Sequence, residues 1–524
     1  MYLKTLLTTT AGLAISATAA LADYSLAILH TNDFHARFEP ISKYDGPCSA
    51  DDNAVGKCFG GSARLVTAVE AAKRQYNNVI LVDGGDQFQG SLFYTYYKGK
   101  MTAEFMNKLG YDAMTVGNHE FDDGPEVLRG FMDSVNFPVL MSNADVSGEP
   151  LLADTLAKST IIERGGEKIG LIGLTPEDTD ELASPGPNIS FSVPANAVAV
   201  EVGRLEAQGA NKIIVLSHSG YDVDLAVAEA VPGIDVIVGG HSNTLLSNTN
   251  SRASGPYPTL VGNTAVVQAY AYGKYLGELN VVFDDDGNLK SASGEPILID
   301  GNIVEDAASV ARIAELAAPL DEIRNKIVAN TIAPIGGDRA VCRSQECELG
   351  SLIADAMLER VKDQGISIAL QNGGGIRASI DEGDVTMGEV LTVLPFQNTL
   401  STFEVTGAVL KEALENSVSQ IEDGAGRFAQ VAGLKYSFNA SLPAGERITE
   451  VMVAKDGGFM ALDMDATYGV VSNNYVRGGG DGYKMFKDAA NAYDYGPDVA
   501  DVLAEYLAAN PDFTPYTDGR ITAQ

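Results

Sequence analysis

Residues 84–124 read GGDQFQGSLFYTYYKGKMTAEFMNKLGYDAMTVGNHEFDDG, and this stretch decides the predicted fold. It follows the apolar run Val79–Val82 (VILV) and contains a second run, Ala113–Val116 (AMTV); both are typical of buried strands. Between them, residues 101–109 have a helical pattern of apolar positions. This order predicts an α/β fold built on a β-sheet. A polar cluster follows each run at once, GGD after the first and GNHEFD after the second.

Three more apolar runs of the N-terminal half end in the same way. They are Leu26–Leu29 with Asp33-Phe34-His35, Ile213–Leu216 with Ser217-His218, and Val236–Val238 with Gly239-Gly240-His241-Ser242-Asn243. A further strand is expected at Ile169–Leu174 and a further helix at residues 63–75. Of the five histidines in the chain, all but His30 lie in these clusters. Because open α/β sheets place ligands at the carboxyl ends of their strands, we expect the clusters to meet at one site.

The residue types in the clusters suit a metal site, since Asp, His and Asn side chains are donors that divalent ions take. In Asp33-x-His35, alternate residues of an extended chain face one way, so both can reach one ion. Asp86 stands between two such groups and could bridge two ions. One histidine after a strand is more often structural, and GGD and GGH are common turns, but five clusters in one register favour metal binding. Two ions about 3.5–4 Å apart form a recognised device for hydrolysing phosphate esters.

Composition limits the class of protein. The chain has 524 residues, a formal net charge of −34 and a sequence pI near 4.4. It contains no run of Lys or Arg, which argues against a general affinity for nucleic acid polymers. The length predicts two or three domains. A helix-forming segment at residues 304–328, split by Pro319, separates the two halves, and a second α/β region with helices at 349–362 and 407–418 begins near Ala333.

The first 22 residues have the pattern of a signal peptide. Lys4 gives a short positive region, residues 6–19 form an apolar stretch, and Ala20-Leu21-Ala22 is an A-x-A cleavage site, so the mature chain would begin near Asp23. An uncleaved anchor is the alternative, which the short apolar stretch disfavours. Residues 517–524 are mostly polar, which disfavours a GPI-type anchor. We therefore expect a soluble, exported protein.

Four cysteines fit an oxidising compartment: Cys48, Cys58, Cys342 and Cys347. Three pairings are possible, of which the two local ones are the simplest. A zinc site built from all four cysteines is the competing interpretation, and its spacings are wrong.

In this order, the clusters D-x-H, GGD, GNHEFD, SH and GGHSN resemble those of the calcineurin-like metallophosphoesterases. More specifically, the chain resembles the 5′-nucleotidase family, which includes bacterial periplasmic UDP-sugar hydrolases and animal ecto-5′-nucleotidases, from about Leu29 to Phe486. The resemblance implies an αββα sandwich, a helical linker and a C-terminal α/β nucleotide-recognition domain. We expect a signal peptide at 1–22, the catalytic domain at 23–302, the linker and hinge at 303–330 and the substrate-binding domain at 331–524. The short positive region and the family together predict the bacterial periplasm.

The family pattern implies a role for each cluster residue. The metal ligands would be Asp33 and His35 at the first ion, Asp86 between both ions, Asn118, His218 and His241 at the second ion, and Asn243 as a further ligand of the first. His119 and Asp122 would form the catalytic pair, in which Asp122 orients the ring of His119 near the leaving oxygen. His30 is expected to be structural or to support the ligands.

The C-terminal half would recognise the nucleotide. The implied residues are Arg339, Arg343, Asn372 and Arg377 for the phosphate and nucleotide, Phe396 and Tyr475 as aromatic rings on either side of the base, and Asp481 for the ribose hydroxyls. Without the resemblance, a Phe after Pro is more often a core residue, and the glycine-rich motifs could be turns alone. Tyr475 departs from the animal enzyme, which has Phe there, although tyrosine can still stack. The resemblance also supports the pairs Cys48–Cys58 and Cys342–Cys347.

The implied reaction is two-metal hydrolysis of nucleoside 5′-monophosphates. UDP-sugars, 2′,3′-cyclic nucleotides or 3′-nucleotides are alternative substrates within the family, and a non-catalytic nucleotide-binding periplasmic protein is an alternative of another class. Two divalent ions are expected, zinc first, with Mn, Co or Mg as alternatives. The expected partner is a nucleotide, with no nucleic acid polymer and no membrane anchor. Base preference, oligomeric state and regulation cannot be read from the sequence.

Overall fold

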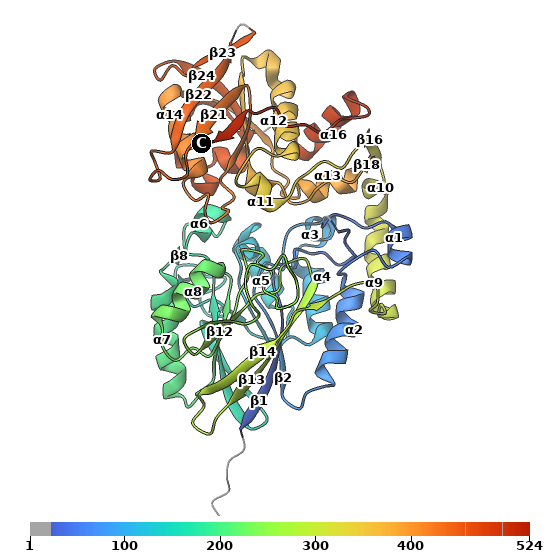
Figure 1. Ribbon diagram of the computed structural model, residues 1–524, viewed down its shortest axis with the longest axis vertical. Coiled ribbons are helices and arrows are strands. Elements are labelled where there is room, and N and C mark those ends of the chain that lie inside the picture. The colour runs from blue at the N-terminus through green and yellow to red at the C-terminus, as the bar shows by residue number, and fades with distance from the viewer. Residues whose placement is uncertain (1–22, 44, 456, 495) are drawn as a thin grey trace, which may run out of the picture.

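The computed structural model describes residues 23–43, 45–455, 457–494 and 496–524, so the predicted signal peptide lies outside the described residues. The chain forms two α/β bodies, the N-terminal half below and the C-terminal half above in Figure 1, with a connector along one side. No helix of the described part is long and apolar enough to cross a membrane.

Two β-sheets form the centre of the N-terminal half. The first has the order β14-β13-β1-β2-β3-β4 with β15 paired to β13, and the second has the order β11-β12-β10-β9-β7-β6. The bounds of the first sheet are β1 Tyr24–Thr31, β2 Val79–Asp83, β3 Ala113–Thr115, β4 Val139–Leu140, β13 Tyr275–Phe283, β14 Leu289–Gly294 and β15 Ile297–Leu298. Those of the second are β6 Ser159–Arg164, β7 Glu167–Leu174, β9 Ile213–Ser217, β10 Val236–Val238, β11 Thr259–Val261 and β12 Thr264–Val267. A short separate pair joins β5 Ala144–Asp145 and β8 Ser190–Phe191.

The sheets pack face to face, and helices cover the outer face of each. The core between the sheets takes Ile28 and Val82 from the first sheet and Leu171 and Val238 from the second. The helices are α1 Ala50–Ala54, α2 Ser62–Lys73, α3 Leu92–Tyr97, α4 Gly99–Leu109, η1 His119–Phe121, α5 Gly124–Met132, α6 Thr179–Leu182, α7 Pro194–Ala207 and α8 Tyr221–Ala230. This is the expected αββα sandwich, and each of the six predicted strands is present.

The register of the strands positions the site. In the first sheet β1, β2 and β3 run parallel to one another, and in the second β9 and β10 do so. Their carboxyl ends therefore lie at the edges of the two sheets that face the C-terminal half (Figure 1). Each of the five polar clusters begins at one of these ends.

The connector is helical over fewer residues than the sequence predicts. It consists of α9 Ala307–Ala317, the 3₁₀ turn η2 Ala318–Leu320 with Pro319 near its start, and α10 Asp321–Arg324. The last part of the expected helical linker instead forms strand β16, Ile327–Thr331, which pairs antiparallel with β18, Gly383–Thr386. Backbone pairing with the C-terminal half outweighs the helical propensity of these residues.

The C-terminal half contains a five-stranded sheet β20-β17-β24-β19-β25, a four-stranded sheet β23-β22-β21-β26 and the pair β16-β18. Its further strands are β17 Ile368–Asn372, β19 Leu400–Thr406, β20 Ala429–Ala432, β21 Leu434–Phe438, β22 Ile448–Lys455, β23 Gly458–Ala461, β24 Thr467–Asn473, β25 Ala490–Tyr493 and β26 Ile521–Ala523. Its helices are α11 Arg339–Cys342, α12 Glu348–Val361, η3 Lys362–Gln364, η4 Gly373–Gly375, α13 Met387–Val393, α14 Gly407–Val418, α15 Asn474–Arg477, η5 Gly480–Gly482, η6 Lys484–Phe486 and α16 Val499–Ala509. One core packs α12, α13 and α16 on the larger sheet, and a second packs α14 between the two sheets.

Two disulfides tie local loops, Cys48–Cys58 and Cys342–Cys347, and the described residues contain no free cysteine. The second one joins the end of α11 to the residue before α12, and α11 faces the N-terminal half (Figure 1). The disulfide therefore holds the loop that carries Arg343, directly after the helix that begins at Arg339.

Candidate active site between the two halves

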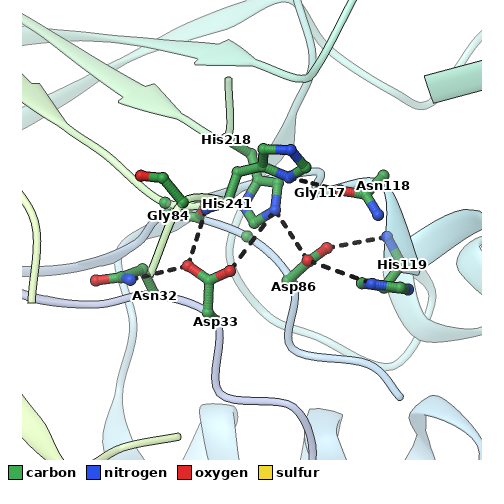
Figure 2. A network of polar contacts seen from close by, with 12 residues as sticks. Asn32, Asp33, Gly84, Asp86, Gly117, Asn118, His119, His218 and His241 are labelled. Atoms are coloured by element: carbon green, nitrogen blue, oxygen red, sulfur yellow. Dashed lines mark hydrogen bonds and ion pairs between the residues drawn. The ribbon is translucent and has the colours of Figure 1, made fainter. Parts of the chain in front are cut away.

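The polar clusters meet where the sequence predicts, in a network of buried side chains at the strand ends (Figure 2). Five of the seven predicted metal ligands have positive φ: 49° at Asp33, 52° at His35, 56° at Asp86, 69° at His241 and 53° at Asn243. This backbone conformation is costly for residues other than glycine and is concentrated at functional sites. The surrounding fold holds the ligand-bearing turns in it.

Asp33, His35 and Asp86 form one group whose candidate ligand atoms all lie within 4.8 Å of one another. Nε2 of His35 is 4.0 Å from Oδ1 of Asp33 and 3.8 Å from Oδ2 of Asp86. Nδ1 of His35 lies 3.1 Å from the carbonyl oxygen of Phe88 and donates to it, which leaves the lone pair on Nε2, toward the carboxylates.

Asp86, His218 and His241 form a second group, which shares Asp86 with the first. Nδ1 of His218 donates to the carbonyl oxygen of Gly84 at 2.6 Å, so its Nε2 carries the lone pair. Nδ1 of His241 is 3.0 Å from Oδ1 of Asn118, which brings the predicted asparagine ligand to this group.

Asn243 lies beside the first group. One atom of its side-chain amide lies 2.8 Å from Oδ1 of Asp33 and the other lies 3.1 Å from Nη1 of Arg339. The seven predicted ligands are therefore brought together in one network.

The donor set fits divalent metal ions. Nε2 of His218 is fully buried and lies 2.9 Å from Oδ2 of Asp86, yet makes no hydrogen bond with proper geometry. Two buried carboxylates, Asp33 and Asp86, lie within one network (Figure 2), and among the described residues their ion-pair partners are histidines. Buried carboxylates and an unpartnered imidazole nitrogen are costly unless a cation satisfies them, and mixed oxygen and nitrogen donors suit divalent ions.

His119 and Asp122 form a pair at the edge of this network. Nδ1 of His119 is 2.7 Å from Oδ2 of Asp122, and the backbone N–H of His119 donates to Oδ1 of Asp86 at 2.9 Å. Nε2 therefore faces the metal-ligand groups, 3.9 Å from Oδ2 of Asp86. Burial acts to lower the pKa of His119, but Asp122 and Asp86 outweigh it and raise the pKa above its ordinary value.

Two supporting residues were not predicted from the sequence. Glu120 is completely buried and accepts hydrogen bonds from the backbone N–H groups of Asp86, Gln87, Phe88 and Gly117, at 3.0, 2.9, 3.1 and 2.6 Å. Gln89 donates from Nε2 to Oδ2 of Asp122 at 3.1 Å. The only sequence signal for their supporting roles is their position, since Glu120 stands in the GNHEFD motif and Gln89 follows GGD.

Three arginines reach this network from the C-terminal half. Nη2 of Arg339 donates to the carbonyl oxygen of His241 at 2.8 Å, and Nη2 of Arg377 is 3.0 Å from Nε2 of His35. Arg343 is buried, and its Nε has no hydrogen-bond partner among the described residues. Burial, followed by Arg339 and Arg377, holds the pKa of Arg343 well below its usual value. Clustered guanidinium groups of this kind are arranged for an anion.

A cavity of about 590 Å³ lies between the halves and is lined by both. Its lining includes Asp86, Asn118, His119, Asp122 and His241 from one side and Arg339, Arg343, Asn372, Arg377, Phe396, Tyr475 and Asp481 from the other. This volume is in the range of small-molecule sites. The predicted catalytic and substrate residues therefore face one common space.

The nucleotide-side residues are held by one another. Oδ2 of Asp481 accepts from Nδ2 of Asn372 at 2.6 Å, and Oδ1 accepts from the hydroxyl of Tyr475 at 3.2 Å. The hydroxyl that distinguishes Tyr475 from phenylalanine therefore fixes the carboxylate of Asp481. Phe396 lies against His119, with ring centroids 5.5 Å apart.

His30 lies outside the two metal-ligand groups. It is buried in β1, and its Nε2 is 2.8 Å from the hydroxyl of Tyr257. The expectation of a structural histidine agrees with these contacts.

Comparison with known proteins agrees with the geometry. Residues 26–244 match the calcineurin-like phosphoesterases, and residues 327–488 match the 5′-nucleotidase C-terminal domain. A curated 5′-nucleotidase of Diplobatis ommata is 38% identical, covering 95% of this chain and 90% of its own, and that of Homo sapiens is 38% identical, covering 96% and 91%. The crystal structure of a 5′-nucleotidase precursor from Thermus thermophilus superposes with a TM-score of 0.91 at 41% identity, covering 95% of this chain and 99% of the other.

Proposed function

Because the chain belongs to the 5′-nucleotidase family of metal-dependent phosphoester hydrolases, we propose that it removes the phosphate from nucleoside 5′-monophosphates. One observation supports this most: Arg339, Arg343 and Arg377 of one half face the metal-ligand groups of the other across a single cavity. A phosphate monoester is the ligand that needs both the arginines and the metal-ligand groups. Its dianion pairs with the guanidinium groups while its phosphorus lies at the metal-ligand groups.

We further propose two divalent ions that share Asp86. Their ligands would be Asp33, His35, Asp86, Asn118, His218, His241 and Asn243. Zinc is the first choice for this mixture of donors, with Mn, Co and Mg as alternatives. Bound ions would supply charge neutralisation at the phosphoryl oxygens and activation of water.

The side chains of the protein would perform the remaining tasks. The three arginines would bind the phosphoryl oxygens and orient the ester bond. His119, held at Nδ1 by Asp122, would present its Nε2 proton to the departing ester oxygen. Phe396 and Tyr475 would contact the base, and Asp481 would accept hydrogen bonds from the ribose hydroxyls.

We propose a catalytic domain at residues 23–302, a linker and hinge at 303–330 and a substrate-binding domain at 331–524. We also propose export to the bacterial periplasm after cleavage near Asp23. The two disulfides support an oxidising compartment.

The test is phosphate release by the purified mature chain after removal of metals with a chelator and return of Zn or Mn. AMP, UDP-glucose and 2′,3′-cyclic AMP are compared side by side. The proposal expects metal-dependent release from AMP and its loss in His119→Ala. The organic products are separated as well, because cleavage of UDP-glucose first yields UMP and glucose 1-phosphate, and cleavage of 2′,3′-cyclic AMP first yields an adenosine monophosphate, without free phosphate. Cleavage of these two substrates but not of AMP would move the function elsewhere in the family. Tight binding of AMP without any turnover would favour a nucleotide-binding protein.

A further inference from the structure

Resting on the proposed function, we propose that Phe396 is a positioning residue for the reacting centre, in addition to any contact with the base. Its ring packs on the imidazole of His119 and beneath the guanidinium group of Arg377. Removing it would therefore slow hydrolysis even of a substrate that has no base.

The contacts of Phe396 with these two groups are close. The ring centroids of Phe396 and His119 are 5.5 Å apart with an interplanar angle of 25°, which is a stacked arrangement. The guanidinium carbon of Arg377 lies 5.6 Å from the centroid of the Phe396 ring, within the range of a cation–π contact. One side chain thus touches the proposed acid and one of the proposed phosphate-binding groups.

The hydrogen bonds of the His119 side chain do not fix the orientation of its ring by themselves. Asp122 holds the imidazole at Nδ1, and the ring of His35 meets it edge-on at a centroid distance of 5.3 Å and an angle of 71°. A single hydrogen bond lets a ring pivot about its axis. Stacking of Phe396 on the face of the ring restricts this pivot and directs Nε2 toward the metal-ligand groups.

A backbone hydrogen bond holds the segment of Arg377 beside the segment that leads to Phe396. The N–H of Arg377 donates to the carbonyl oxygen of Val393 at 2.9 Å, at the end of α13, and Phe396 follows three residues later. Beyond Phe396, Gln397 has a φ of 56°, and the carbonyl oxygen of Asn398 accepts from the N–H of Val499 at 2.9 Å. The loop that carries Phe396 therefore has fixed ends and lies beside the segment that carries Arg377.

The contact also joins the two halves of the molecule. His119 belongs to η1 of the N-terminal half, whereas Arg377 follows η4 and Phe396 follows α13, both in the C-terminal half. Alignment of His119 by Phe396 therefore depends on the approach of the two halves that forms the cavity. The approach that encloses a nucleotide would at the same time align the acid.

Phe459 provides a matched control. It lies in β23, its side chain is 44% exposed, and it is not among the residues that line the cavity. Phe459→Leu makes the same change of side chain away from the site. It should leave hydrolysis of both substrates unchanged.

The test measures kcat and KM of the metal-loaded enzyme with AMP and with glycerol 3-phosphate, which has neither base nor ribose. Wild type, Phe396→Leu, Phe396→Tyr and the control Phe459→Leu are compared, and bound metal and thermal unfolding verify that each is folded. Phe396→Leu should lower kcat roughly tenfold or more on both substrates, as misplacement of reacting groups does. Phe396→Tyr, which keeps an aromatic ring at this position, should keep most of the wild-type kcat on both substrates. Phe459→Leu should change kcat and KM for both substrates less than about twofold, since Phe459 lies away from the cavity.

A raised KM for AMP with unchanged kcat on both substrates in Phe396→Leu would overturn the inference, since Phe396 would then only stack on the base. If glycerol 3-phosphate is turned over too slowly to measure, kcat at saturating AMP decides between the two results. Failure of the proposed function itself would be distinguishable, because wild type would then release no phosphate from AMP.

Discussion

Replacing Glu120 by glutamine should disturb the metal site from a distance. Oε1 of Glu120 accepts from the N–H groups of Gln87 and Phe88, and Oε2 accepts from those of Asp86 and Gly117. Glutamine keeps one of these oxygens and replaces the other by an NH₂ group. Two buried N–H groups would then lose their acceptor and face a donor.

The cost can be worked from these four bonds. A buried donor left without an acceptor costs about 1–3 kcal/mol, so two such donors cost about 2–6 kcal/mol. Native proteins are stable by only about 5–15 kcal/mol, so this loss is a large fraction. Part of the strain would be relieved by movement of the loop that carries Asp86. We therefore expect Glu120→Gln to lower both the stability of the N-terminal half and the affinity for metal.

The assay is urea unfolding of the metal-free protein, together with metal titration against a chromophoric chelator. Glu126→Gln is the control, because Glu126 belongs to α5, is exposed and lies six residues away along the chain. An unfolding free energy and a metal affinity for Glu120→Gln equal to those of the control would refute the reasoning.

Three further predictions concern other parts of the molecule. Gln89→Leu removes the hydrogen-bond donor to Asp122 and should lower kcat for AMP by about tenfold, with little change in KM. This loss is a fraction of what general acid catalysis contributes. An unchanged kcat would show that Asp122 needs no second hydrogen-bond partner. Arg343→Gln should raise KM for AMP by at least about tenfold in steady-state kinetics, because a charged contact with the phosphate is lost. Its Tm should equal or exceed that of wild type, because the substitution removes a buried cation. A KM equal to that of wild type would count against the anion site. Burial raises the pKa of Asp235 to about 7, so its protonated form favours the folded state, and its contribution to stability is full below about pH 4 and is lost as pH rises through about 7. Asp235→Asn should flatten that part of the profile of Tm against pH, and parallel profiles of the two proteins would contradict the shift.

Much of the N-terminal half could be predicted because its signals are local. Each ligand-bearing cluster follows an apolar strand directly, and parallel strands bring their carboxyl ends together whatever the rest of the chain does. The convergence of His35 and Asp86, which follow the neighbouring parallel strands β1 and β2, follows from that rule, whereas that of His241, which follows β10 of the second sheet, also needs the two sheets to pack together. The pairing of two sheets into a sandwich came from the resemblance, because periodicity alone does not distinguish it from one large sheet.

The missed features depend on contacts between distant segments. Glu120 and Gln89 gain their roles from loops more than thirty residues away, and only the fold reveals which backbone groups they meet. Residues Ile327–Thr331 have helix-forming neighbours, but β18 offers them a partner and they become a strand. The stacking of Phe396 on His119 joins the two halves of the molecule, and no local pattern in either half predicts this contact.

We propose a composite site, in which the N-terminal half holds the metals and arginines of the C-terminal half hold the phosphate. Crystals grown with Zn and a non-hydrolysable AMP analogue, measured by anomalous diffraction, place both groups at once. We expect two anomalous peaks on either side of Asp86, with the phosphate of the analogue in contact with Arg339, Arg343 and Arg377 and its base near Phe396 and Tyr475. A single peak, or an analogue bound away from the arginines, would show that the site is not built in this way.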